Sequence, residues 1–326
     1  MKKFSILLLF SLLSLVLVAC NNSTTTEEKT TTADDSNKLK IYTTVYPLSY
    51  FTQEIGGDFV EVSSIYPPGS NEHTFEPTQK DMMLLADSDL FFYIGLGLEG
   101  FVENAQKTLA KENVKLIATA DTIAEEHLHT SAVEEHHEDH DHHEGEHDDH
   151  HHGDIDPHVW LSPIIAKDLA LSIKNELITA LPEQEEYFND NYNQLISELD
   201  SLNSDFEKMA ASASNKTFFV SHASFGYIAG QYGLEQVAIA GLNSQSEPSQ
   251  KELMEIVDLA KELNIKYVLF EQNVSSKLST IIQNEVGAKA LTLHNLSVLT
   301  ESDINNNETY FTLMKKNIET LQEALN

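Results

Sequence analysis

Histidine is the residue type in this chain with the clearest chemical consequence, because its spacing defines two kinds of candidate metal site. Eleven of the 15 histidines lie between positions 127 and 152, with nine Asp and Glu residues and no lysine. Imidazoles and carboxylates at this density can bind a borderline divalent cation such as Zn²⁺. The segment has no amphipathic period, so we expect an exposed, mobile loop. Its candidate low-affinity metal ligands are His127, His129, His136, His137, His140, His142, His143, His147, His150, His151 and His152.

The four other histidines are far apart in the sequence, and three of them lie where a folded metal site can form. His222 ends an apolar strand-like run, where ligands of open α/β sheets collect. His73 lies in a loop after another such run, and His158 lies just before a long helical segment. Three imidazoles from separate segments can converge on one cation, and zinc usually takes four ligands in a tetrahedron. His294 lies in no ligand-like pattern, and we expect it to be structural.

Two series of alternating strands and helices are expected to position these histidines. Apolar runs predict strands at residues 39–45, 60–65, 90–94, 114–118, 217–220, 235–240, 266–270 and 288–293. Helical periods between and after them fall at residues 48–55, 78–86, 99–110, 225–232, 251–263, 274–285 and 310–324. Residues 162–181 and 183–213 predict two longer helices between the series. We therefore predict an α/β fold with two parallel-sheet lobes joined by a long rigid helix and a metal site in the cleft between them. One continuous α/β domain is the alternative.

The N-terminus predicts export and a membrane anchor. Lys2 and Lys3 precede an apolar run over residues 4–19, which has the length of a signal-peptide core and is short for a membrane span. The run ends in Leu-Val-Ala-Cys, which resembles the bacterial lipobox, and in that class Cys20 receives lipid. A plain signal peptide is the alternative. Residues 21–38 have no aromatic or branched apolar side chain and predict a flexible tether.

The composition limits the possible partners. There are 52 acidic residues against 20 basic ones, for a net charge of −32. A chain this acidic repels nucleic acid and anionic headgroups and attracts cations. Cys20 is the single cysteine, so an intrachain disulfide is excluded.

Three motifs around the separated histidines carry a resemblance to a known family. They are Asn-Glu-His-Thr-Phe-Glu-Pro at 71–77, Asp-Pro-His-Val-Trp-Leu-Ser-Pro at 156–163 and Ser-His-Ala-Ser-Phe-Gly-Tyr at 221–227. Together with the lipobox and the histidine-rich segment, the chain resembles the metal-binding lipoproteins of bacterial ABC importers for zinc and manganese. The resemblance is to the high-affinity zinc-uptake solute-binding proteins in particular, and it covers essentially the whole mature chain.

The resemblance implies one metal ion between two lobes, with His73, His158 and His222 as ligands. Manganese-binding members carry a carboxylate at the position of His222, so an imidazole there implies zinc, in agreement with the nitrogen preference of Zn²⁺. A late Asp or Glu often completes the site, and Glu301 is the residue that we predict. Asp303, Glu271 and a water molecule are the alternatives for this fourth position.

The sequence pattern predicts a domain plan, and the resemblance implies a role. The plan is a signal peptide (1–19), a lipidated Cys20 with tether (20–38), a first lobe (39–161) with the histidine-rich loop, connecting helices (162–213) and a second lobe (214–326). The implied role is extracytoplasmic zinc capture for an ABC permease by a monomer anchored to the outer face of the cell membrane, with zinc as the transported ion and no enzymatic activity. Manganese or another divalent ion is the main alternative. A zinc hydrolase is less favoured, since the sequence lacks a His-Glu-x-x-His or Gly-x-Ser-x-Gly motif. A surface adhesin is less favoured because nothing in the sequence encodes a binding partner of that kind.

Overall fold

The computed structural model describes residues 38–132, 155–273 and 276–326. The expected signal peptide, Cys20, most of the tether and nine of the eleven histidines of the rich segment lie outside these ranges. None of the helices within them combines the length and hydropathy needed to span a bilayer.

The first sheet has four parallel strands in the order β2-β1-β3-β4. These strands are β1 (Leu39–Thr43), β2 (Val60–Ser64), β3 (Leu90–Tyr93) and β4 (Lys115–Ala118). Every residue of β3 is buried, as expected for a central strand covered on both faces. The helices of this lobe are α1 (Tyr46–Gly56), α2 (Gln79–Ala86) and α3 (Val102–Leu109).

The second sheet repeats the arrangement, with parallel strands in the order β6-β5-β7-β8. These strands are β5 (Thr217–His222), β6 (Glu235–Ala240), β7 (Tyr267–Phe270) and β8 (Lys289–Thr292). The helices are α7 (Gly226–Tyr232), α8 (Gln250–Glu262), α9 (Lys277–Val286), α10 (Glu301–Asn305) and α11 (Tyr310–Ala324). The central strand β5 is buried throughout and ends at His222, which places this imidazole at the carboxyl edge of the sheet.

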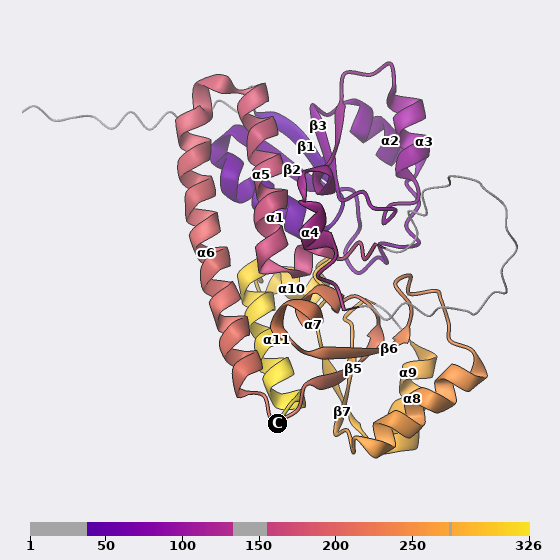
Figure 1. The fold of residues 1–326 in the computed structure, drawn as a ribbon. Coiled ribbons are helices and arrows are strands. Elements are labelled where there is room, and N and C mark those ends of the chain that lie inside the picture. Colours follow the sequence, from indigo (N-terminus) through magenta and orange to yellow (C-terminus); the bar gives the residue numbers. More distant parts are fainter. Residues whose placement is uncertain (1–37, 133–154, 274–275) are drawn as a thin grey trace, which may run out of the picture. The chain divides into compact units, whose positions relative to one another are not determined.

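Two long helices, α5 (Pro163–Ala180) and α6 (Glu185–Ser212), connect the lobes (Figure 1). The 28 residues of α6 span about 42 Å at 1.5 Å per residue. This helix packs against α1 of the first lobe and α11 of the second. Its buried side chains recur at three- and four-residue spacings, as in Leu195, Leu199, Leu202 and Phe206. The prediction of two parallel-sheet lobes joined by a long helix is therefore confirmed.

Two segments differ from the sequence-based expectations. Residues 125–128 form a short helix, α4 (Glu125–Leu128). A turn at residues 129–130 follows it, and residues 131–132 have no regular secondary structure. The expectation of an unstructured loop is therefore wrong for the first residues of the histidine-rich segment. Residues 301–305, where the sequence predicts no helix, form α10, whose N-cap Thr300 makes a capping box with Asp303. The sequence Thr-x-x-Asp is the local signal for that helix start.

Candidate metal centre

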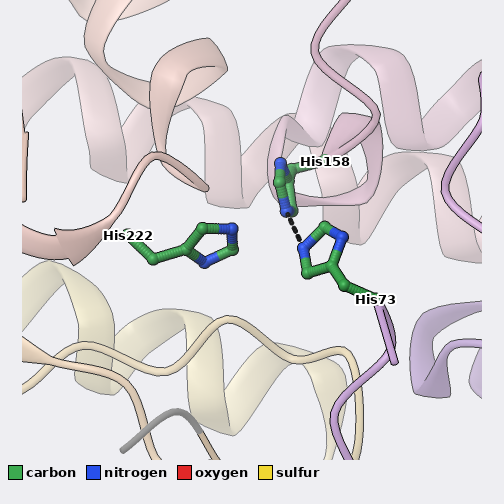
Figure 2. A group of neighbouring side chains, drawn as sticks. All are labelled: His73, His158 and His222. Atoms are coloured by element: carbon green, nitrogen blue, oxygen red, sulfur yellow. Dashed lines mark hydrogen bonds between the residues drawn. The ribbon is translucent and has the colours of Figure 1, made fainter. Parts of the chain in front are cut away.

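Three histidines from distant segments meet between the two sheets. Among the described residues, one group of three or more His, Cys, Asp or Glu side chains has its potential ligand atoms within 4.8 Å of one another, and it consists of His73, His158 and His222. The ring centroids are 4.9–5.3 Å apart. Figure 2 shows the three rings converging from separate backbone segments. The convergence expected from the sequence is present in the structure.

The spacing of two of these rings already fits a zinc ion. The Nε2 atoms of His158 and His73 are 3.3 Å apart. Two ligands at 2.0–2.1 Å from a tetrahedral zinc ion are separated by about 3.3–3.4 Å. The rings are also shielded from solvent, since His158 and His222 are 0% exposed and the side chain of His73 is 5% exposed. An ion bound here would be held by protein atoms in a largely dry site.

His158 is held by a buried carboxylate. Its Nδ1 lies 2.8 Å from Oδ1 of Asp156, and its backbone N–H donates to the same oxygen at 2.9 Å. Asp156 is 2% exposed. A carboxylate on Nδ1 favours the proton there and leaves the Nε2 lone pair free for a metal ion. The sequence placed Asp156 near His158, and the structure gives it this orienting contact.

His222 is held in the same way from the neighbouring strand. β5 and β7 run in register with Val220 opposite Leu269, so the next positions bring His222 beside Glu271. Both oxygens of Glu271 lie 3.1 Å from Nδ1 of His222. Its Nε2 donates to the carbonyl of Leu242 at 2.9 Å. Metal binding through Nε2 must therefore break that hydrogen bond.

The surroundings of His73 and His222 shift the pKa values of the two imidazoles in opposite directions. Burial, and then the positive charges of His158 and His222, lowers the pKa of His73 to about 2. Burial alone would lower the pKa of His222 as well, but the charge and hydrogen bonds of Glu271 and the Leu242 carbonyl outweigh it and raise that pKa to about 9. The pKa of Glu271 is lowered, because contact with His222 and Asn295 outweighs the effect of its burial. At neutral pH the metal-free site thus holds a neutral His73 and a protonated His222.

Replacing Glu271 with glutamine is expected to weaken metal binding on the order of 10–100-fold, the usual cost of losing an outer carboxylate partner of a ligand histidine. The amide removes the charge that orients His222 and supports its Nδ1 proton. Metal affinity of purified variants, measured by competition with a chelator and corrected for the protons that zinc displaces from His222, checks this. Glu255→Gln on the exposed face of α8 is the matched control. Equal affinities of the two variants would remove Glu271 from the site.

Glu72 is a second buried carboxylate, and it lies beside His73. It is 1% exposed, and its Oε1 lies 4.0 Å from Nε2 of His73. Its oxygens accept hydrogen bonds from Asn273 at 3.0 Å, Ser297 at 2.9 Å and Asn295 at 3.2 Å, all from the second lobe. Asn295 also donates to Glu271 at 2.6 Å and so joins the two carboxylates. Sequence analysis missed these amides, because nothing in the local pattern links residues more than 200 positions apart.

The other predicted ligands lie elsewhere. Glu301 is exposed at the first position of α10 and is not in the group of converging ligands. Asp303 caps α10 and lies 3.2 Å from Nε2 of His294, which explains His294 as a structural residue. Of the histidine-rich segment, His127 and His129 fall within the described residues. His127 Nδ1 contacts Asp168 at 2.8 Å, and the side chain of His129 is 70% exposed. Neither belongs to a group of converging ligands among these residues.

The chain matches the family model described as "Zinc-uptake complex component A periplasmic" over residues 41–324. It belongs to this family. It is also 35% identical to the high-affinity zinc uptake system protein ZnuA of Bacillus subtilis, over 99% of this chain and 98% of that protein. All three histidines lie within the matched region.

A further relative and the solved structure of one of its domains agree with this family. The zinc-binding lipoprotein AdcA of Streptococcus pneumoniae is 38% identical over 99% of this chain, and the chain spans 61% of the length of that relative. The crystal structure of the Zn(II)-bound ZnuA-like domain of the same AdcA superposes with a TM-score of 0.71 at 33% identity, covering 88% of this chain and 99% of that domain. Both the architecture and the sequence therefore agree with membership of this family.

Proposed function

We propose that this protein captures Zn²⁺ outside the cytoplasm and delivers it to the membrane permease of an ABC importer. The observation that carries the proposal is the convergence of three imidazoles within 4.8 Å in a buried site between the lobes. Family membership supports it, and it assigns the protein to transport and not to catalysis. Zinc is the cargo. The lipobox at Cys20 supports anchoring to the outer face of the cell membrane, where a monomer on a short tether can reach the permease.

The donor set favours zinc over manganese. Three nitrogen ligands suit Zn²⁺, whereas Mn²⁺ prefers sites richer in carboxylate and water oxygen. Purification without added metal, followed by titration with zinc and then with manganese, tests this directly. We expect one tightly held zinc ion per chain and a much weaker hold on manganese. Tighter binding of manganese, or no tightly held ion of either metal, would contradict the proposed function.

The fourth ligand can be decided by two matched glutamine variants. Glu301 is our sequence-based candidate and stays a prediction, while burial and the 4.0 Å distance to His73 support Glu72. We expect Glu72→Gln to weaken zinc binding at least as much as the loss of an outer partner, on the order of 10–100-fold. Glu301→Gln is expected to bind zinc like the unaltered protein, because its exposed side chain lies outside the converging group. If competition with a chelator shows that Glu301→Gln weakens zinc binding and Glu72→Gln does not, Glu301 is the fourth ligand.

We propose that the histidine-rich segment binds additional zinc ions, each more weakly than the group of His73, His158 and His222 does. When a segment becomes ordered only on binding, the loss of conformational entropy offsets part of the free energy gained from each metal contact. Such a segment binds its ions weakly. Deleting residues 133–153 is expected to lower the total number of bound zinc ions and to leave one tight ion. Equilibrium dialysis with metal analysis counts both. Loss of the tight ion in the deletion variant would refute this division of roles.

A further inference from the structure

Residues 127–132, here called the strap, lie across helices α5 and α7. At one end, Nδ1 of His127 contacts Oδ2 of Asp168 on α5 at 2.8 Å. At the other end, the backbone N–H of Ala132 donates to the carbonyl of Gly226 on α7 at 3.0 Å. The carbonyl oxygen of Thr130 sits so close to Gly230 that a Cβ there would lie 1.8 Å from it. The strap therefore needs a glycine at position 230 to lie where it does.

The strap reaches the metal centre through Ser131. The hydroxyl of Ser131 donates to Oδ2 of Asp156 at 2.7 Å. The other oxygen of Asp156 accepts from the ring and the backbone of His158. With a partner on each oxygen, the carboxylate is fixed in rotation, and the imidazole that it holds is fixed as well. A chain of two hydrogen bonds thus joins the strap to the Nε2 atom that faces His73.

Tyr227 on α7 fixes the same arrangement from the second lobe. Its hydroxyl lies 2.8 Å from the carbonyl oxygen of Asp156 and 3.4 Å from that of Leu128. One side chain therefore contacts both the strap and the residue that orients His158. Because Tyr227 is fully buried, this junction is part of the packed interior.

We propose that Ser131 is a positioning residue for zinc capture, which acts through Asp156 on His158 and is itself held in place by the strap. The inference rests on the proposed function. Metal-binding histidines depend on the group that holds their second nitrogen, and losing such a group costs 10–100-fold in affinity. Ser131 is one hydrogen bond further out than Asp156. Its contribution therefore lies at the lower end of that range.

Ser131→Ala tests the inference in the full-length protein, with the zinc ion as the probe. We expect the zinc affinity to fall roughly tenfold, mainly through faster zinc dissociation, because His158 is less firmly oriented. Ser131→Thr, which keeps a hydroxyl, should restore most of the affinity. Thr130→Val is the matched control, since the Thr130 hydroxyl donates to the His127 carbonyl and not to Asp156. The melting temperature of the metal-free proteins separates positioning from stability, as a purely structural residue would lower it without changing zinc dissociation.

Gly230→Ala gives an independent route to the same result. The added methyl group must displace the Thr130 carbonyl and with it Ser131. We expect Gly230→Ala to weaken zinc binding. Adding Ser131→Ala to Gly230→Ala should lower the zinc affinity little further, because both substitutions remove the same hydrogen bond from Ser131 to Asp156. If the unaltered protein binds one zinc ion and Ser131→Ala binds and releases it identically, the inference fails while the proposed function stands. Equal losses in Ser131→Ala and Thr130→Val would also overturn it. If the unaltered protein binds no zinc, both the inference about Ser131 and the proposed function are wrong.

Discussion

Replacing His222 with alanine is expected to weaken zinc binding by more than about 100-fold, since losing even an outer partner of a ligand histidine costs 10–100-fold. His222 supplies one of three converging imidazoles and is the ligand contributed by the second sheet. Without it, the remaining nitrogens come from His73 and His158, and the ion no longer ties the two lobes together. Competition with a chromophoric chelator measures the affinity.

Two further variants make the result of His222→Ala interpretable. The change leaves the buried carboxylate of Glu271 without its charged partner, which can cost about 3–5 kcal/mol of folding stability. His73→Ala removes a ligand without breaking such a pair, because the nearest carboxylate oxygen is 4.0 Å away. It should show the same large loss of affinity in a folded protein. His129→Ala, which removes an exposed imidazole outside the group, should keep the tight site. Tight zinc binding in both ligand variants would exclude this centre.

Zinc binding near neutral pH is expected to release about one proton, which comes from His222. The contacts of this residue raise its pKa to about 9, so its ring is protonated at pH 7 in the metal-free protein. Zinc binds a deprotonated nitrogen and must displace that proton. His73, with a pKa lowered to about 2, is already neutral and releases none. The raised pKa thus makes zinc compete with protons over the whole range below about pH 9.

The sign and size of the pH effect follow from this competition. Each unit of pH below about 9 should lower the apparent zinc affinity about tenfold through His222 alone, as expected for one proton exchanged per ion. Calorimetric titration in buffers with different ionisation enthalpies gives the number of protons released. Glu271→Gln should reduce that number at pH 7, since it removes the main cause of the raised pKa. An affinity that is constant between pH 6 and 8, with no proton released, would contradict the protonated state of His222.

Most of the fold could be predicted from the sequence because its signals are local. Continuous apolar runs such as Leu-Phe-Phe-Tyr at 90–93 and Thr-Phe-Phe-Val at 217–220 form fully buried central strands. The three- and four-residue spacing of apolar positions identified α6. The element boundaries differ from the expected ones by at most three residues, as for the helix expected from 99, which begins at Val102. Backbone hydrogen bonding, which the pattern does not encode, sets those ends.

The three histidines could also be predicted, but their surroundings could not. A strand end or a strand-following loop is visible in the sequence, and each such position carried one imidazole. The contacts of Glu72 with Asn295 and Ser297 depend on how the lobes pack, over separations of 223 and 225 residues. Glu301 was favoured through a family pattern, whereas local capping placed it on the exposed start of α10. The composition of residues 127–132 does not indicate that they are ordered, because their contacts with Asp168 on α5 and Gly226 on α7 depend on residues far away in the sequence.

The most direct test of the metal centre is the position of a zinc ion in crystals of the loaded protein, located by anomalous scattering at the zinc edge. We expect one fully occupied ion about 2.0–2.1 Å from a nitrogen of each of His73, His158 and His222. The Leu242 carbonyl should then have lost its hydrogen bond from His222. A fully occupied ion bound by at most one of these three histidines would contradict the proposed centre.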